Sequence, residues 1–218
     1  MYERSIQLYE RLAAESPAGT SYAVSLAGTY SNMGRLIGDQ GKLEESLPWI
    51  TKGIDILEDA LRRDPRVKKA RESLVTASWT RAMTLCGLER HSQALDDWSR
   101  AIELDDGHYH QQLRLRRASN LLNVKDHVRA TADAAAIAAF AAATAEDIYG
   151  AASVYASCVP LAADDGARAD ACAAQAVVLL RRALDKGYKD FDRIRTHPDL
   201  DALRSRGDFQ QLTRELDR

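Results

Sequence analysis

The sequence has few residues that break helices and few that favour sheets. Its 218 residues include only five prolines and 12 glycines, and aromatic residues make up 6%. This composition, together with abundant alanine, favours closely packed helices over sheets. The three cysteines, Cys86, Cys158 and Cys172, form no CxxC pair, and their odd number argues against a disulfide framework. We expect them to be small buried side chains.

The sequence also lacks an excess of charge of either sign. Its formal net charge of -2 gives no general attraction to nucleic acid or to an anionic membrane. The longest weakly apolar stretch, residues 134–145, is too short to cross a bilayer, which requires about 20 residues, and we expect it to form a packed helix. No signal peptide is visible. We therefore expect no nucleic-acid partner, no membrane insertion and a cytoplasmic location, although a longer protein containing this chain could carry an anchor.

Sequence patterns typical of active sites are absent as well. There is no GxSxG elbow, no GxxxxGK[ST] phosphate loop and no GxGxxG motif. His108 and His110 form an HxH pair, but on a helix the two rings would point about 200° apart. No cysteine or carboxylate cluster completes a metal site around them. We predict no catalytic residue, no metal and no cofactor, with a helical-repeat enzyme or metal-dependent hydrolase as the remaining catalytic alternative.

A stripe of small and bulky residues recurs along the chain. Ala94, Trp98 and Ala101 are spaced i, i+4 and i+7, which places them on one side of an α-helix. The small residues allow a neighbouring backbone to approach, and we expect Trp98 to be buried. The same stripe recurs at Ser46, Ile50 and Gly53, at Ala130, Ala134 and Ile137, and at Ala176, Leu180 and Ala183, with a truncated copy at Ser5, Tyr9 and Leu12 that ends at Pro17.

A second small residue precedes three of these stripes at a constant distance. Gly34 and Ser46, Ala82 and Ala94, and Ala118 and Ala130 are each twelve residues apart. A constant offset is expected when two antiparallel helices, joined by a short turn, approach most closely at one pair of facing residues. In the last unit the matching residues, Ala152 and Ala176, are 24 apart, which predicts a longer inter-helix loop within residues 160–171.

This spacing resembles the tetratricopeptide repeat, a helix-turn-helix unit with a period of about 34 residues. The resembling residues are Tyr30, Met33, Gly34, Ile37, Gly41, Ser46, Ile50 and Gly53 in one unit, Ala82, Leu85, Leu88, Ala94, Trp98 and Ala101 in the next, and Ala118, Leu121, Val124 and Ala130 in the third. The resemblance implies an all-α solenoid, a right-handed superhelix of antiparallel helix hairpins. The expected single array comprises residues 1–17, hairpins 22–64, 66–106, 108–144 and 145–187, and capping helices in 190–218.

Three further stretches narrow the resemblance. Residues 22–34, residues 147–155 and residues 197–209 are similar, in this order, to the carboxy-terminal repeat region of planctomycete-type bacterial serine/threonine protein kinases. This resemblance implies that a kinase domain lies upstream and that the chain recruits substrates or regulators. A free-standing adaptor is the alternative. The opening half-repeat also leads us to expect that the natural protein continues upstream, and that the open amino-terminal helix could mediate self-association.

In the repeat family the first helix of each hairpin lines a concave face that binds peptides. The matching residues here are Ser31, Arg35, Asp39, Thr76, Trp79, Met83, Gln112, Leu115, Arg116, Ser119, Tyr149 and Ser153. They include aromatics, an adaptable methionine and arginines, which are common at binding hot spots. Lysine is missing from these positions, so the family's clamp for carboxy-terminal carboxylates is not reproduced. We expect a protein or peptide ligand with apolar anchors.

An arginine cluster and an internal proline depart from the usual repeat pattern. Arg114 and Arg117 stand where the repeat normally has large apolar residues, and Arg116 lies between them. The three arginines could form a solvated face or could recognise an acidic or phosphorylated peptide, because guanidinium groups pair bidentately with carboxylate and phosphate. Pro48 is expected past the first turn of a helix, where it removes a backbone donor and should produce a kink.

Overall fold

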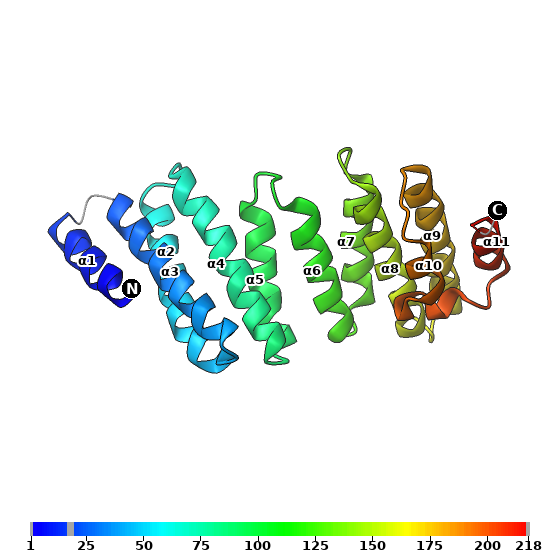
Figure 1. Ribbon diagram of the computed structural model, residues 1–218, viewed down its shortest axis with the longest axis horizontal. Coiled ribbons are helices and arrows are strands. Elements are labelled where there is room, and N and C mark those ends of the chain that lie inside the picture. The colour runs from blue at the N-terminus through cyan, green and yellow to red at the C-terminus, as the bar shows by residue number, and fades with distance from the viewer. Residues whose placement is uncertain (1, 17–19, 217–218) are drawn as a thin grey trace. The chain divides into compact units, whose positions relative to one another are not determined.

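The computed structural model describes residues 2–16 and 20–216, and helices make up 82% of it, with no strand in the described part. The expected all-α class is therefore confirmed; Pro17, the expected end of the first helix, lies outside the described residues. The helices are α1 (Tyr2–Glu15), α2 (Thr20–Asp39), α3 (Leu43–Arg63), α4 (Lys68–Gly87), α5 (His91–Leu104), α6 (His110–Asn123), α7 (His127–Ala139), α8 (Ala145–Leu161), α9 (Gly166–Asp185), α10 (Phe191–Thr196), the 3₁₀ helix η1 (Pro198–Leu203) and α11 (Gly207–Glu215) (Figure 1).

The contacts divide the chain into two compact units. Residues 1–109 form unit 1, which contains α1 to α5, and residues 110–218 form unit 2, which contains α6 to α11 and η1. In each unit, successive helices pair as antiparallel hairpins, as the tetratricopeptide-like pattern predicts. Among the described helices, none has a stretch long and apolar enough to cross a membrane.

The hairpin of α2 and α3 packs most closely at the residues that the twelve-residue offset predicts. A Cβ atom added to Gly34 on α2 would lie 3.0 Å from the carbonyl oxygen of Ser46 and 2.5 Å from Ile50 Cγ1, both on α3. A Cβ added to Gly53 on α3 would lie 2.8 Å from the carbonyl oxygen of Ala27 on α2. Only glycine lets the two backbones approach this closely without displacing one of them.

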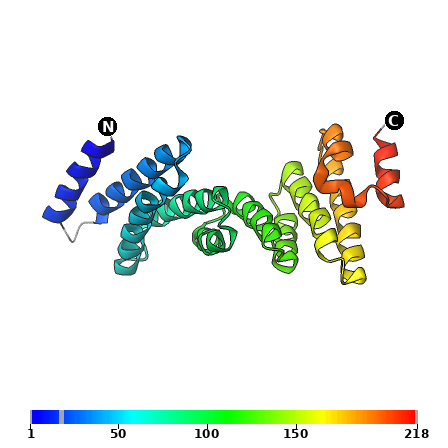
Figure 2. The ribbon, with the colours of Figure 1, turned by 90° about the horizontal axis from the view of Figure 1, so that it is seen from below.

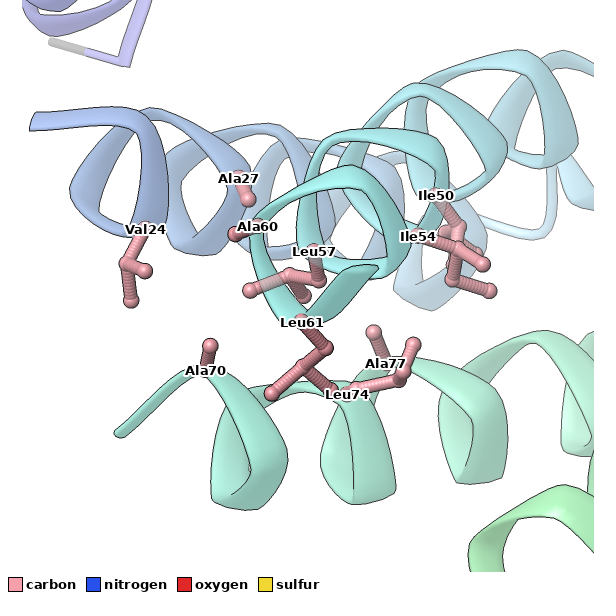
Figure 3. Packing of buried hydrophobic residues seen from close by; sticks show 10 residues of the cluster. All are labelled: Val24, Ala27, Ile50, Ile54, Leu57, Ala60, Leu61, Ala70, Leu74 and Ala77. Atoms are coloured by element: carbon pink, nitrogen blue, oxygen red, sulfur yellow. The ribbon is translucent and has the colours of Figure 1, made fainter. Parts of the chain in front are cut away.

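The core of unit 1 lies between α2, α3 and α4, and Figure 3 shows its side chains. Leu61 of α3 points toward Leu74 of α4, and Leu57 of α3, Ala77 of α4 and Val24 of α2 belong to the same cluster. Leu57 and Leu74 are completely buried. Because buried apolar side chains contribute about 1.5 to 3 kcal/mol each, this cluster anchors the second hairpin to the first. Pro48 is the sixth residue of α3, inside the helix as expected.

The amino-terminal helix packs on α2 rather than standing alone. Ile6 of α1 is buried in a cluster with Leu26 and Tyr30 of α2, and Tyr9 is half-buried against the same cluster. The hydroxyl of Tyr30 donates a hydrogen bond of 2.6 Å to Glu10 Oε1. The stripe that the sequence showed in this half-repeat therefore has a partner within unit 1.

Trp98 of α5 is buried, as its place in the stripe predicts, with 1% of its surface exposed. Ala94 and Ala101, which flank it on the same stripe, are completely buried. In unit 2, Ala118 of α6 and Ala130 of α7 are also completely buried, and Ile137 packs within the same core with 1% exposure. The hairpins of α4 with α5 and of α6 with α7 thus follow the pattern.

The expectation of one helix through residues 134–145 is wrong. The helix α7 ends at Ala139 and α8 begins at Ala145. Thr144 caps α8, because its hydroxyl accepts a hydrogen bond from the backbone N–H of Asp147, whose carboxylate accepts one from the backbone N–H of Thr144. Such a capping box satisfies backbone donors that a helix start leaves unpaired, and it starts a new helix despite the surrounding alanines.

The expectation of a long loop in the fourth hairpin is also wrong. The helix α8 continues to Leu161 and α9 begins at Gly166, so only residues 162–165 connect them. The twelve surplus residues lie almost entirely in the two helices. After its close-approach residue, α8 continues about one turn further than α4 does, and α9 begins about two turns earlier before its own than α5 does. Ala152 and Ala176 are completely buried. Extending both helices adds buried contacts, whereas a longer loop would only add entropy cost.

The carboxy-terminal segment packs on the last hairpin of unit 2. Its buried side chains are Ile194 of α10, Leu200 and Leu203 of η1, and Phe209 and Leu212 of α11. Within unit 2, η1 packs mainly on α8 and α11 packs on α9 (Figure 2). Phe191, at the start of α10, is 37% exposed.

Candidate functional site

The candidate surface in unit 1 begins on α2, where only two of the three expected residues face solvent. Arg35 and Asp39 are exposed. Ser31 is half-buried, and its hydroxyl donates to the carbonyl oxygen of Ala27 at 3.0 Å. A Cβ added to Gly53 would lie 2.5 Å from Ser31 Oγ, so Ser31 faces α3. Ser31 therefore belongs to the hairpin contact and leaves little of itself to a ligand.

On α4 the expected residues form a partly apolar surface. Thr76 is exposed, Met83 is 42% exposed and Trp79 is half-buried. The Trp79 ring lies 6.4 Å from the ring of buried Trp98 and meets the ring of Tyr109 edge-on at 5.5 Å. Aromatic rings prefer such tilted contacts, which hold Trp79 in a fixed orientation. A large apolar side chain in a fixed orientation is suited to anchor a ligand, because little side-chain entropy is lost on binding.

In unit 2, α6 presents polar side chains to solvent. Gln112, Arg116 and Ser119 are exposed, while Leu115 is half-buried. Leu115 packs on α8, since a Cβ added to Gly150 would lie 3.0 Å from Leu115 Cδ2. The absence of a side chain at Gly150 thus makes room for Leu115 between the two helices.

The placement of Tyr149 and Ser153 in an open groove is wrong. Tyr149 is 1% exposed and Ser153 is 8% exposed. The ring of Tyr188, which follows α9, stacks on the Tyr149 ring at 4.5 Å with an interplanar angle of 4°, and the Arg193 guanidinium lies 4.6 Å from the same ring. Burial raises the pKa of both tyrosines, to about 12 for Tyr188. The chain's own carboxy-terminal segment thus covers this part of α8.

Arg114 and Arg117 are not available to an acidic ligand as free cations. Both donate to Asp133 of α7: Arg114 Nη1 lies 2.8 Å from Oδ1, and Arg117 donates at 2.8 Å to Oδ2 and at 2.7 Å to Oδ1. Asp133 is 1% exposed. Of the three arginines, only Arg116 is exposed to solvent. The internal pairing therefore leaves Arg116 as the arginine of this cluster that is most accessible to a ligand.

The same pairing occurs in unit 1. Arg81 of α4 donates to both carboxylate oxygens of Asp97 on α5, at 2.8 and 2.7 Å, and also donates to Thr51 Oγ1 on α3 at 3.3 Å. Asp97 is 4% exposed, and its hydrogen bonds raise the pKa of Arg81. Sequence reasoning missed these pairs, although a signal existed: arginine and aspartate are separated by sixteen residues in both hairpins.

A cavity in unit 1 adjoins the α4 surface at Thr76. It has a volume of about 450 Å³. Side chains of α4 line one side, and the end of α5 with the following loop lines the other. Its lining residues are Lys68, Arg71, Glu72, Val75, Thr76, Leu104, Asp105, Asp106, His108 and Tyr109. No pattern in the sequence indicated this cavity.

Neither a metal-ligand cluster nor an activated Cys158 thiol occurs in the described part of the chain. Within residues 2–16 and 20–216, no group of three or more His, Cys, Asp or Glu side chains is placed to hold a metal. Cys158 is completely buried, and burial raises the pKa of its thiol to about 12, which disfavours the nucleophilic thiolate.

Comparisons with known proteins find only distant structural likenesses. No protein-family model and no curated protein matches the sequence. Among solved structures, a MamA RS-1 ArsTM double mutant is 18% identical, with 88% of this chain and 96% of that chain covered and a TM-score of 0.47. TTC0263, a thermophilic TPR protein of Thermus thermophilus, is 20% identical over 93% and 90% of the two chains, with a TM-score of 0.36. YrrB, described as a TPR protein with an unusual peptide-binding site, is 18% identical over 81% and 96%, with a TM-score of 0.37. Likenesses this distant transfer no function to the chain.

Proposed function

We propose that this chain is a noncatalytic protein-interaction module that binds a peptide or protein segment on the first helices of its hairpins. The observation that carries the proposal is the surface of α4, where Met83 is 42% exposed beside the oriented ring of Trp79. An adaptable methionine next to a rigid aromatic is a combination that recurs at protein-binding surfaces. Within unit 1, the exposed residues Arg35 and Asp39 of α2 would provide polar contacts around these anchors.

The biological setting that we propose is the carboxy-terminal part of a bacterial serine/threonine kinase in the cytoplasm. The support is the sequence resemblance in residues 22–34, 147–155 and 197–209. There the module would recruit substrates or regulators. A free-standing adaptor accounts equally well for the surface of α4, and the sequence upstream of residue 1 would distinguish the two settings: a glycine-rich loop with HRD and DFG motifs would indicate the kinase.

The proposal is tested by affinity capture from a bacterial lysate with the purified chain as bait. Met83→Glu places a charge on the α4 surface, and Val128→Glu is the matched control, because Val128 is a comparably exposed apolar residue, at 52%, on the second helix α7. A third bait carries Arg35→Glu, at an exposed position of α2 in the same unit as α4. Partners that bind in proportion to bait concentration are identified by mass spectrometry, and thermal melting confirms that each bait is folded.

We expect Met83→Glu to reduce capture by about tenfold or more, as loss of a hot-spot residue does, and Val128→Glu to leave it unchanged. Arg35→Glu should have a smaller effect, since an exposed charge contributes little to binding. Equal capture by Met83→Glu and by the unmodified chain would reject the α4 surface. Attention would then move to self-association through α1, where Leu8 is 50% exposed.

A further inference from the structure

The cavity between the start of α4 and the end of α5 has the size and lining of a side-chain pocket. Its volume of about 450 Å³ exceeds the space that one large apolar side chain requires. Val75 of α4, 3% exposed, together with half-buried Leu104 and Tyr109, provides apolar surface. These three residues come from α4, from α5 and from the loop after α5, so that folding of the second hairpin assembles the pocket.

The charged side chains around this pocket differ in how many hydrogen bonds they already make. Asp105 is used by its own turn, because its carboxylate accepts hydrogen bonds from the backbone N–H groups of Gly107 at 3.1 Å and Tyr109 at 3.0 Å. Arg71 donates to the carbonyl oxygen of Pro65 at 2.9 Å, but no carboxylate pairs with it among the described residues. The guanidinium of Arg71 therefore retains donors that can point to a ligand.

The start of α4 adds to the positive potential on this side of the pocket. Lys68 and Glu72 both line the pocket and form an exposed ion pair 3.5 Å long, so that their charges offset one another. No side chain caps α4 at Val67, and its first turn contains no acidic residue. The positive end of the helix dipole is thus not neutralised locally. An anionic group placed beside Arg71 would meet favourable charge from its guanidinium and from the start of the helix.

We propose that this pocket binds a large apolar side chain of a partner peptide, and that the residue following it is an aspartate or glutamate whose carboxylate pairs with Arg71. This inference deepens the proposed function, on which it rests, by naming the sequence class of the ligand. Exposed Asp106 lines the pocket from the side opposite α4, so a second acidic residue on that side would be repelled. The apolar group supplies affinity through burial, while the carboxylate selects the ligand and its direction.

The test uses the full chain, labelled with ¹⁵N, and three capped dipeptides as probes: Ac-Phe-Glu-NH₂, Ac-Phe-Lys-NH₂ and Ac-Ala-Glu-NH₂. Amide chemical shifts of Val75, Thr76, Leu104 and Tyr109 report on binding. Arg71→Glu reverses the charge at the pocket. Lys69→Glu is the matched control, because Lys69 is an exposed cation in the same turn of α4 that does not line the pocket.

We expect Ac-Phe-Glu-NH₂ to shift these four amides in a saturable way and Ac-Ala-Glu-NH₂ to have no saturable effect. Ac-Phe-Lys-NH₂ should bind about threefold more weakly than Ac-Phe-Glu-NH₂, as the contribution of one exposed charge pair implies. Arg71→Glu should invert this preference, and Lys69→Glu should preserve it. Absence of saturable shifts, equal binding of the two phenylalanine probes, or a preference unaffected by Arg71→Glu would overturn the inference.

The outcomes distinguish this inference from the proposed function. Loss of lysate capture in Met83→Glu without dipeptide binding would retain the interaction surface of α4 and reject the pocket. Dipeptide binding with unchanged capture by Met83→Glu would retain the pocket and reject the α4 surface as the main contact. Each result therefore decides one of the two proposals independently of the other.

Discussion

The helices α4 and α8 each carry an aromatic residue and, four positions later, a second residue at the same repeat positions. These residues are more exposed to solvent on α4 than on α8. Trp79 and Tyr149 each lie three residues before the small residue of the first helix, Ala82 or Ala152, and Met83 and Ser153 each follow it directly. Met83 is 42% exposed, whereas Tyr149 and Ser153 are 1% and 8% exposed. The difference arises because Tyr188 and Arg193 cover α8.

This comparison shows that a repeat position determines the side of the helix on which a residue lies, but not what covers that side. Stacking on Tyr188 converts a position that could contact a ligand into a core position of unit 2. Both tyrosine hydroxyls are buried. Met83 of α4 remains accessible to a ligand. The predictions below test this difference between α4 and α8, from the largest effect to the smallest.

The largest expected difference concerns the two aromatic residues themselves. Tyr149→Ala should lower the free energy of unfolding by about 3 to 5 kcal/mol, as removal of a buried aromatic does. Trp79→Ala should cost about 1 to 2 kcal/mol, because the ring is only partly buried and loses less apolar contact. Urea denaturation of both variants measures the difference. A larger loss for Trp79→Ala would contradict the assignment of the covered and open helices.

The buried arginine–aspartate pairs allow a second comparison between the hairpins. Asp133→Ala leaves Arg114 and Arg117 without their shared partner and should cost about 2 to 4 kcal/mol. Asp96→Ala, at an exposed position of α5, is the control and should change stability by less than about 0.5 kcal/mol.

The first hairpin has apolar residues where the second and third hairpins have an arginine–aspartate pair, and these residues suggest a replacement for the pair. Met33 and Trp49 occupy the equivalent positions of the first hairpin, and the double variant Arg81→Met, Asp97→Leu reproduces this apolar arrangement. It should change stability by less than about 2 kcal/mol, because replacing both members leaves no unpaired charge. A loss as large as that of Asp133→Ala would show that the pair supplies more than a matched contact.

Proline inside a helix permits a comparison of the first and fourth hairpins. Pro48 interrupts α3 at its sixth residue, and Pro160 lies in the last turn of α8. Pro48→Ala should stabilise the chain by about 1 to 3 kcal/mol, because it restores a backbone donor and removes a clash with the preceding turn. Pro160→Ala should change less, since helix ends fray. Thermal melting checks both; destabilisation by Pro48→Ala would show that packing requires a bend there.

The smallest effect is a pH dependence at the contact between α1 and α2. Burial, followed by the hydrogen bond to Glu10, raises the pKa of Tyr30 to about 12 from its ordinary value of 10.0. Because the folded state holds the proton more tightly, this stabilisation is complete below pH 10 and is lost as the pH rises toward 12. Tyr30→Phe should remove about 1 kcal/mol at neutral pH and flatten this part of the stability curve. An unchanged alkaline slope in Tyr30→Phe would contradict the assignment.

Local packing could be predicted from the sequence, whereas long-range cover could not. The offset of Gly34 and Ser46 predicted the close approach of α2 and α3, because a hairpin relates residues that are near in sequence. The burial of Tyr149 depends on Tyr188, which lies far along the chain and outside the repeat pattern. The roles of Arg114 and Arg117 were missed because a buried cation is recognised only through its partner, Asp133.

The most direct test of the central claim, that one repeat position is open on α4 and closed on α8, is thiol labelling at equivalent residues. Met83→Cys and Ser153→Cys are made in a chain with Cys86→Ser, since Cys158 and Cys172 are buried. Their rates of reaction with a maleimide are measured in the native protein and in denaturant, and peptide mass spectrometry separates labelling at the introduced cysteine from labelling at Cys158 and Cys172. The account predicts native labelling of Met83→Cys near its denatured rate and labelling of Ser153→Cys slowed by about tenfold or more, since local opening must precede reaction. Equal native rates at the two positions would contradict it.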